Sequence, residues 1–162
     1  MLYDYLKARG VLFQTAQQFK LGLALNDWDA LLKHLKEKNV SLALMEKAGL
    51  IITRENAQGF YDRFRHRIMF PVSDTIGQCR AFGGRCLENE AGKEDKNTAK
   101  YINSPETPVY TKGQHLYGLH VAKQAITQED EAVIVEGYVD CLMPHQAGVT
   151  NVIASLGTAL TV

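Results

Sequence analysis

The sequence predicts an α+β fold, in which a mixed region of helices and strands is followed by a β-α-β unit. Apolar residues at 28–35 recur at spacings of three and four, the period of a helix with one buried face. Arginine alternates with other residues over 63–68, the period of a β-strand. A non-alternating apolar run at 132–135 precedes a helical stretch at 138–147 and another apolar run at 151–154, as in a parallel sheet.

The composition predicts a globular domain of ordinary size. The chain has 162 residues, of which 46% are hydrophobic and 22% are charged, so it can bury a core. No apolar run approaches the roughly 20 residues of a membrane span, and the first residues lack the features of a secretory signal. The three cysteines have no Cys-x-x-Cys spacing. This argues against disulfides and a four-ligand zinc site, and favours a reducing cytoplasm.

Charge is spread unevenly along a chain whose net charge is zero. Residues 1–125 hold all 18 Lys and Arg against 13 acidic residues, a balance of +5. Residues 126–162 hold five acidic residues and no Lys or Arg, a balance of −5. We therefore expect two parts with different roles, a basic one suited to a polyanion and an acidic one suited to a divalent metal.

Short helices are predicted before residue 50. One covers 2–8 and ends near Gly10, and a further turn or two covers 15–20. Asn26 is the expected cap of a longer helix that reaches about residue 38, with Trp28 in its buried stripe.

A capped helix and a hairpin follow. Ser41 is the expected cap of a helix at 42–48, which Gly49 ends because glycine readily adopts the left-handed conformation. The runs at 50–53 and 60–61, separated by a polar turn, then predict a hairpin.

The arginine run is the first candidate binding site. As a strand, it would place Arg63, Arg65 and Arg67 on one face, with Phe64 and Ile68 on the other. Three neighbouring guanidinium groups repel one another, so this face would suit an anion such as a nucleic-acid phosphate. A solvated sheet edge with scattered salt bridges is the alternative, which the pattern leaves open.

A second hairpin is predicted from the runs at 68–72 and 79–82. Gly83 and Gly84 would interrupt its second strand, either as a bulge or to let the backbone approach a ligand closely, with Arg85 beside them. The polar stretch at 87–99 has no periodicity and is expected to be a mobile loop.

The stretch 100–113 is the second candidate binding site. Its two prolines prevent a regular helix and predict an extended, anchored chain. Lys100, Asn103 and Lys112 would donate hydrogen bonds to phosphates or sugars, and Tyr101 and Tyr110 would offer stacking faces to bases. An ordinary surface loop with its tyrosines packed inward remains the alternative.

The acidic end contains the candidate catalytic residues. A helix is expected at 116–126, and the run at 132–135 is expected to be a strand buried on both faces. Glu136 follows this strand, at the sheet edge where ligands bind in such folds, and Asp140 lies near the start of the next helix. The two carboxylates could share a divalent metal. Alternatively, Glu136 only caps the helix and Asp140 only favours its dipole.

These residues resemble the bacterial replicative DNA primases of the DnaG type. The resemblance extends through nearly all of the chain, because several motifs occur in the family's order. They are Asp62-Arg-Phe-Arg-His-Arg-Ile-Met-Phe-Pro71, Phe82-Gly-Gly-Arg85, Lys100-Tyr-Ile-Asn-Ser-Pro-Glu-Thr107, Leu116-Tyr-Gly-Leu119, Val135-Glu-Gly-Tyr-Val-Asp140 and Ala154-Ser-Leu-Gly-Thr-Ala159. The family makes short RNA primers on single-stranded DNA from ribonucleoside triphosphates, in the bacterial cytoplasm.

The resemblance implies a role for each motif. Residues 1–125 would be the basic N-terminal subdomain of the catalytic core, and 126–162 the first β-α-β of a toprim domain. Glu136 would be catalytic and would bind Mg²⁺ or Mn²⁺ together with Asp140, in metal-assisted nucleotidyl transfer. The residues implied to hold template and nucleotide are Arg9, Arg63, Arg65, Arg67, Arg85, Lys100, Tyr101, Asn103 and Lys112.

The chain also departs from the family's pattern. The family's further acidic metal ligands lie beyond position 162, and its zinc-binding and helicase-docking domains have no counterpart here. We therefore expect a fragment that holds template but is inactive alone, with zinc and the replicative helicase bound only by the missing domains. The competing hypothesis is a non-catalytic toprim-like module that binds nucleic acid or a nucleotide. A toprim nuclease or topoisomerase ranks last, because it leaves the arginine run unexplained.

Overall fold

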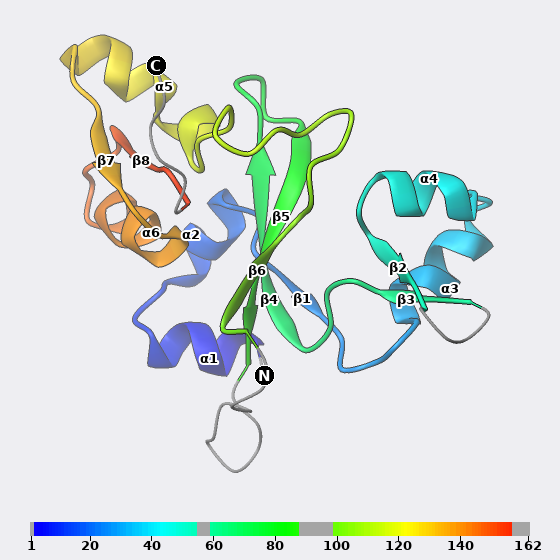
Figure 1. Cartoon of the computed structure of the whole chain (residues 1–162). Coiled ribbons are helices and arrows are strands. Elements are labelled where there is room, and N and C mark those ends of the chain that lie inside the picture. Colours follow the sequence, from blue (N-terminus) through cyan, green and yellow to red (C-terminus); the bar gives the residue numbers. More distant parts are fainter. Residues whose placement is uncertain (1, 55–58, 88–98, 157–162) are drawn as a thin grey trace. The chain divides into compact units, whose positions relative to one another are not determined.

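The fold was analysed in a computed structural model, which describes residues 2–54, 59–87 and 99–156 (Figure 1). The described helices are α1 (Leu2–Ala8), α2 (Phe13–Gln18), α3 (Ala30–Glu37), α4 (Leu42–Lys47), α5 (Leu119–Glu129) and α6 (Tyr138–Gln146). The described strands are β1 (Gly22–Ala24), β2 (Ile51–Thr53), β3 (Phe60–Asp62), β4 (Arg67–Ser73), β5 (Cys79–Cys86), β6 (Tyr101–Asn103), β7 (Val133–Val135) and β8 (Val152–Ala154). The predicted α+β class is confirmed.

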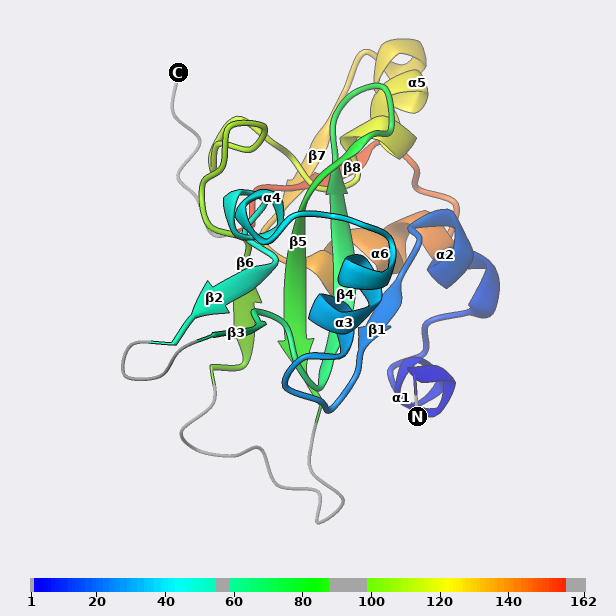
Figure 2. The ribbon, with the colours of Figure 1, turned by 90° about the vertical axis from the view of Figure 1, so that its right-hand side faces the viewer.

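The described strands pair in three groups. A four-stranded sheet has the order β1-β4-β5-β6 (Figure 2). Its β6 is antiparallel to β5, so that Arg85 lies opposite Tyr101. The strands β2 and β3 form the predicted antiparallel hairpin. The strands β7 and β8 are parallel and are joined by α6, which confirms the predicted β-α-β unit.

Contacts divide the chain into two units. The first unit takes its described residues from 1–22, 70–82 and 110–162, and the second from 23–69 and 83–109. Because both units are discontinuous in sequence, this division does not follow the expected boundary between 125 and 126. That boundary therefore stays a prediction.

The first unit has an aromatic core. Tyr117 and Phe70 are almost fully buried, and so is Tyr138 at the start of α6. The rings of Phe70 and Tyr138 stack with their centroids 4.6 Å apart, and Tyr117 meets Tyr138 edge to face at 4.8 Å. Gly118 has a φ of +82°, and a Cβ there would lie 2.8 Å from the Cys141 Sγ atom. This close packing holds the start of α6, the helix that carries Asp140.

The second unit has a smaller apolar core. Leu32, Met45 and Ile51 pack together between α3, α4 and β2. The Ser41 hydroxyl accepts a hydrogen bond from the Leu44 amide at 3.3 Å, and Gly49 has a φ of +68°. The predicted cap and end of α4 are therefore confirmed.

The predicted helix at 26–38 begins later than expected. Asn26 does not cap it, because the cap position falls at Asp29. The carboxylate of Asp62 instead accepts hydrogen bonds from the first-turn amides of Leu31 and Leu32. Trp28 precedes α3 and is 59% exposed, so its predicted burial is wrong. The apolar spacing that predicts the longer helix includes Trp28, which lies before the first turn of α3.

The arginine run is not one strand. The strand β3 ends at Asp62 and β4 begins at Arg67, because His66 has a left-handed φ of +50° that breaks the extended chain. The predicted row of three arginines on one face is therefore wrong. Gly83 and Gly84 do not interrupt their strand either, since β5 runs through both residues.

The predictions for the helix at 116–126, for Tyr110 and for the strand at 132–135 need correction. The helix expected at 116–126 begins at Leu119, and Tyr110 is buried, so it offers no stacking face. Val133 and Ile134 are 37% and 47% exposed, so the predicted burial of β7 on both faces is wrong in the described chain.

The cysteines are free thiols, as predicted. The expected mobile loop lies outside the described residues over 88–98. Within the described chain, every helix is too short or too polar to cross a membrane.

Candidate nucleic-acid interface

Seven of the implied binding residues lie in the second unit, and we call them the basic cluster: Arg63, Arg65, Arg67, Arg85, Lys100, Tyr101 and Asn103. The guanidinium of Arg63 donates to the Asn103 carbonyl at 3.2 Å. The Arg85 Nη1 atom lies 3.3 Å from the Tyr101 hydroxyl, and its guanidinium carbon is 5.5 Å from the centre of that ring. Strand β6 thus contacts two arginines, Arg63 and Arg85, that come from different parts of the sequence.

Arg67 differs from its neighbours because it is only 5% exposed. Its Nη1 atom lies 2.9 Å from the Ala99 carbonyl oxygen, 3.1 Å from that of Gly84 and 3.4 Å from that of Lys100. Burial lowers the pKa of Arg67 from its ordinary value, although an arginine stays charged at neutral pH. The structure therefore brings Arg67 to the backbone of the cluster rather than to its exposed face.

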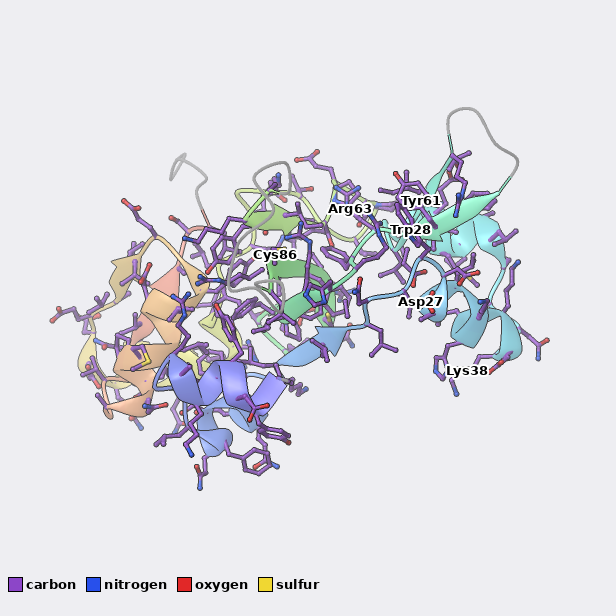
Figure 3. All side chains as sticks on the ribbon, turned by 90° about the horizontal axis from the view of Figure 1, so that it is seen from below. Asp27, Trp28, Lys38, Tyr61, Arg63 and Cys86 are labelled. Carbon is purple, nitrogen blue, oxygen red and sulfur yellow. The ribbon has the colours of Figure 1, made fainter. Side chains whose placement is uncertain are left out.

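Arg65 belongs to an exposed aromatic patch, which we define as Trp28, Tyr61, Arg54 and Arg65. Figure 3 shows Trp28 and Tyr61 close together, and their ring centroids are 5.6 Å apart in an edge-to-face arrangement. The Arg65 guanidinium lies 4.3 Å from the Trp28 ring centre and 4.9 Å from that of Tyr61. Trp28 is exposed and Tyr61 is partly exposed, and such rings flanked by cations form a platform on which a base can stack.

The helical spacing of Trp28 does not reveal that it is a surface residue, but its neighbours in the sequence do. Trp28 stands between Asp27 and Asp29, just after Asn26. Such short polar side chains bond to nearby backbone and favour a turn over a helix interior. The Asp27 carboxylate does so here, since it accepts from the Asp29 amide at 2.9 Å.

The first residue of the arginine motif, Asp62, positions this patch. It is 3% exposed, and its two carboxylate oxygens accept from Leu31 and Leu32 at 2.7 Å and 2.9 Å. Its backbone carbonyl accepts from the Arg65 guanidinium. Desolvation raises the pKa of Asp62 above its ordinary value of 3.8, against the opposing effect of the two amides. Asp62 therefore binds α3 to the chain that leads into Arg65.

The other implied residues belong to the first unit and are described separately. Arg9 follows α1 and is exposed, with its guanidinium carbon 5.3 Å from the centre of the Tyr5 ring. Lys112 is also exposed, in the segment that precedes α5. Glu136 follows β7 directly, and Asp140 lies in the first turn of α6. Both carboxylates are exposed to solvent.

The two carboxylates have the chemistry of a partial magnesium site. A Cβ atom on Gly137 would lie 2.8 Å from the Asp140 Oδ2 atom, so the glycine leaves the space that this carboxylate occupies. Mg²⁺ commonly uses one or two protein carboxylates, with water and phosphate oxygens completing its shell. Two exposed oxygen donors fit that use. Among the described residues, no group of three or more His, Cys, Asp or Glu side chains gathers as a larger metal site would require.

Two protein families match the chain, one over each of its two parts. The toprim domain family matches residues 130–162, so the acidic β-α-β unit has the sequence of a toprim protein. The family described as "DNA primase catalytic core, N-terminal domain" matches residues 1–123. The chain belongs to this DNA primase family.

Individual relatives agree with this assignment. The chain is 48% identical to a DNA primase of Pseudomonas aeruginosa over 96% of its length, and 46% identical to one of Synechococcus elongatus over 98%. It spans 22% of the length of each of these curated relatives. Its fold matches the RNA polymerase domain of Mycobacterium tuberculosis primase DnaG with a TM-score of 0.89 and 37% identity, over 99% of this chain and 50% of that one. A DnaG primase catalytic domain solved bound to single-stranded DNA matches with a TM-score of 0.84 and 37% identity, over 99% of this chain and 47% of that one.

Proposed function

We propose that this chain holds the DNA template and the incoming nucleotide for a primase, the bacterial enzyme that makes RNA primers on single-stranded DNA. The main supporting observation is the basic cluster: Arg63 donates to the Asn103 carbonyl of strand β6, Arg85 lies against Tyr101 on the same strand, and Lys100 directly precedes it within one unit. Membership of the primase family supports it, and so does a relative solved with single-stranded DNA. The ribonucleotide substrates, the helicase partner and the cytoplasmic location are part of the same proposal.

The nucleic-acid contacts are assigned by exposure and chemistry. Lys100 and the partly exposed Arg63 and Arg65 would neutralise phosphates, which is the main source of affinity for nucleic acid. Trp28 and Tyr101 would stack on bases, because any base offers a flat face to an aromatic ring. Arg9, Lys112, Arg85 and Asn103 complete the set proposed to hold template and nucleotide.

The chemical step is assigned to the acidic unit. Glu136 would be the catalytic carboxylate, and Glu136 and Asp140 would bind Mg²⁺ or Mn²⁺. A bound divalent cation supplies charge neutralisation for the triphosphate and lowers the pKa of an attacking sugar hydroxyl. The protein's part would be to offer one carboxylate from the carboxyl end of β7 and one from the first turn of α6, and to hold the template with exposed cations. Further acidic ligands would come from sequence beyond position 162.

Fluorescence anisotropy with labelled single-stranded DNA tests the template assignment. The intact chain should bind, with affinity falling steeply as salt rises. The variant Arg63→Ala, Lys100→Ala should bind more weakly, with a salt slope about 1.4 shallower, since each phosphate contact on a single strand contributes about 0.7. The variant Lys36→Ala, Lys38→Ala removes two exposed lysines from the end of α3 and is the matched control. Equal binding by all three proteins would contradict the assignment.

A non-catalytic binding module is the second candidate. It shares the toprim-like unit at residues 130–162 but gives Glu136 no chemical role. We expect no primer synthesis by the 162-residue chain, and reproducible template-dependent incorporation of ribonucleotides would contradict this. In a primase extended to the length of its relatives, Glu136→Gln should abolish synthesis and leave template binding intact. Unchanged synthesis would instead favour the binding module.

A further inference from the structure

The segment 99–105, which we call the anchored segment, contains three residues of the proposed interface and is attached at both ends within the second unit. At its start, the carbonyls of Ala99 and Lys100 lie within hydrogen-bond distance of Arg67. At its end, Pro105 packs against Gly49, which follows α4. Lys100 and Tyr101 project from between these two attachments and are exposed.

Arg67 is built into the start of the segment. Its Nη1 atom bridges the Gly84 carbonyl of β5 and the Ala99 carbonyl, at 3.1 Å and 2.9 Å. Space for this crossing exists because residue 84 is glycine: a Cβ there would lie 3.0 Å from the Arg67 Cδ atom and 2.8 Å from a ring carbon of Phe64. The buried Arg67 guanidinium therefore links two backbone segments, at Gly84 and at Ala99, and presents little charge to solvent.

Gly49 leaves the space that Pro105, at the other end of the segment, occupies. A Cβ atom at this position would lie 2.6 Å from both Cδ and Cγ of Pro105, which is far inside normal contact distance. The proline ring is rigid and cannot rotate away, so a larger residue at 49 would displace the segment itself. Gly49 also has a φ of +68°, a conformation that other residues adopt at a cost.

We propose that Arg67 and Gly49 are positioning residues that act on the ligand through the anchored segment and do not touch nucleic acid themselves. The inference rests on the proposed template-binding function. It changes the role of Arg67, which the primase resemblance assigned to direct binding. A segment fixed before the ligand arrives loses less conformational freedom on binding, so its contacts yield more affinity.

A double-mutant cycle separates positioning from direct contact. Arg67→Met removes the charge and the hydrogen bonds at similar volume. In the native background it should weaken binding of single-stranded DNA about tenfold, the equivalent of one buried hydrogen-bond loss. In a background of Lys100→Ala and Tyr101→Ala, the same change should cost less than about twofold, because two of the segment's three proposed contacts are already gone. Equal losses in both backgrounds would overturn the proposal. Arg65→Met, on the aromatic patch, is the control expected to lose equally in both.

Gly49 gives an independent test should the Arg67 variant fold poorly. Gly49→Ala should weaken DNA binding about fivefold, and adding Pro105→Ala should restore most of the loss by removing the clashing ring. Gly148→Ala is the matched control, because Gly148 has a φ of +92° but nothing within 4 Å of its Cβ position. It should share the backbone strain and leave binding unchanged. Loss of binding in Gly148→Ala, or no rescue by Pro105→Ala, would contradict the role of Gly49.

Amide hydrogen exchange without DNA distinguishes failure of this inference from failure of the proposed function. Exchange at residues 101–103 should be faster in Arg67→Met and in Gly49→Ala than in the native chain, since both attachments limit local opening. If the native chain does not bind DNA, the template function fails, and with it the claim that these residues serve a ligand. If the chain binds DNA but exchange at 101–103 is unchanged in both variants, the positioning role fails alone.

Discussion

The acidic β-α-β unit and the basic cluster are stabilised by different kinds of contact. In the unit that carries the carboxylates, the rings of Phe70, Tyr117 and Tyr138 pack against one another in a buried core. In the basic cluster, Asp62 and Arg67 hold their surroundings through hydrogen bonds to backbone amides and carbonyls.

The difference follows from what each region presents to solvent. A pair of carboxylates at a strand end needs a rigid support, which close aromatic packing provides. A surface for a polyanion needs cations near its exposed face, so little apolar area is left to bury there. Directional hydrogen bonds to the backbone then provide the rigidity. Asp62 and Arg67 are charged, but they stabilise the structure and do not face the ligand.

The largest predicted effect concerns the aromatic core. Phe70→Ala should lower the free energy of unfolding by about 3–5 kcal/mol, because it removes a buried ring that stacks on Tyr138. Urea denaturation measures the change. Ile76→Ala, in the exposed β4–β5 turn, should change stability by less than about 0.5 kcal/mol. A loss below about 1 kcal/mol in Phe70→Ala would show that this core does not support the unit.

The next effect should appear in binding and not in stability. Trp28→Ala should weaken binding of single-stranded DNA by about 1–3 kcal/mol, the usual range for one stacked base. Its stability should change little, because the side chain is 59% exposed. Leu25→Ala, at 60% exposure, is the matched control for loss of an exposed apolar residue. If Trp28→Ala bound single-stranded DNA with the native affinity in anisotropy titrations, the aromatic patch would not be part of the interface.

A smaller loss is expected at the polar framework. Asp62→Ala should lower the free energy of unfolding by about 1–2 kcal/mol, since two first-turn amides of α3 lose their acceptor. Asp62→Asn should cost less, because one amide oxygen remains. Glu37→Gln, which removes an exposed charge from the same helix, should be nearly neutral. If Glu37→Gln lowered the free energy of unfolding as much as Asp62→Ala, the loss would come from the change of charge and not from the lost helix cap.

The smallest effect is a pH dependence from the same carboxyl group. Desolvation raises the pKa of Asp62 in the folded state above its ordinary value of 3.8, so the native state binds this proton more tightly than the unfolded chain. Its contribution to stability is therefore greatest below pH 3.8 and falls as the pH rises through the folded-state pKa. The stability of the native chain relative to Asp62→Asn should decline from pH 3.5 upward in paired urea titrations. A relative stability that rose with pH would mean that the hydrogen bonds outweigh desolvation.

Predictions from the sequence succeeded where the determining contacts are local. Ser41 and Gly49 lie within a few residues of the helix that they bound, and their chemistry alone predicts its ends. The β-α-β unit was likewise predictable from two apolar runs of the right length. The candidate carboxylates follow from the same pattern, because Glu136 must stand at a strand end wherever β7 forms.

Predictions failed where distant residues decide the outcome. The alternation of the arginine run is broken at left-handed His66, whose amide donates to the Leu25 carbonyl and whose carbonyl accepts from the Leu87 amide. The burial of Arg67 depends on Gly84 and Ala99, which lie 17 and 32 residues away. Trp28 fitted the helical stripe but lies outside α3, whose cap comes from Asp62 across the chain. A three- or four-residue period cannot show such long-range partners.

Photo-crosslinking tests the central claim most directly, because it maps where single-stranded DNA lies on the native chain. The DNA would carry bromodeoxyuridine, and the crosslinked peptides would be identified by mass spectrometry. We expect crosslinks at Trp28, Tyr61 and Tyr101, three exposed or partly exposed rings of the second unit. Crosslinks confined to Tyr3 and Phe13, which are 61% and 46% exposed in the first unit, would contradict it.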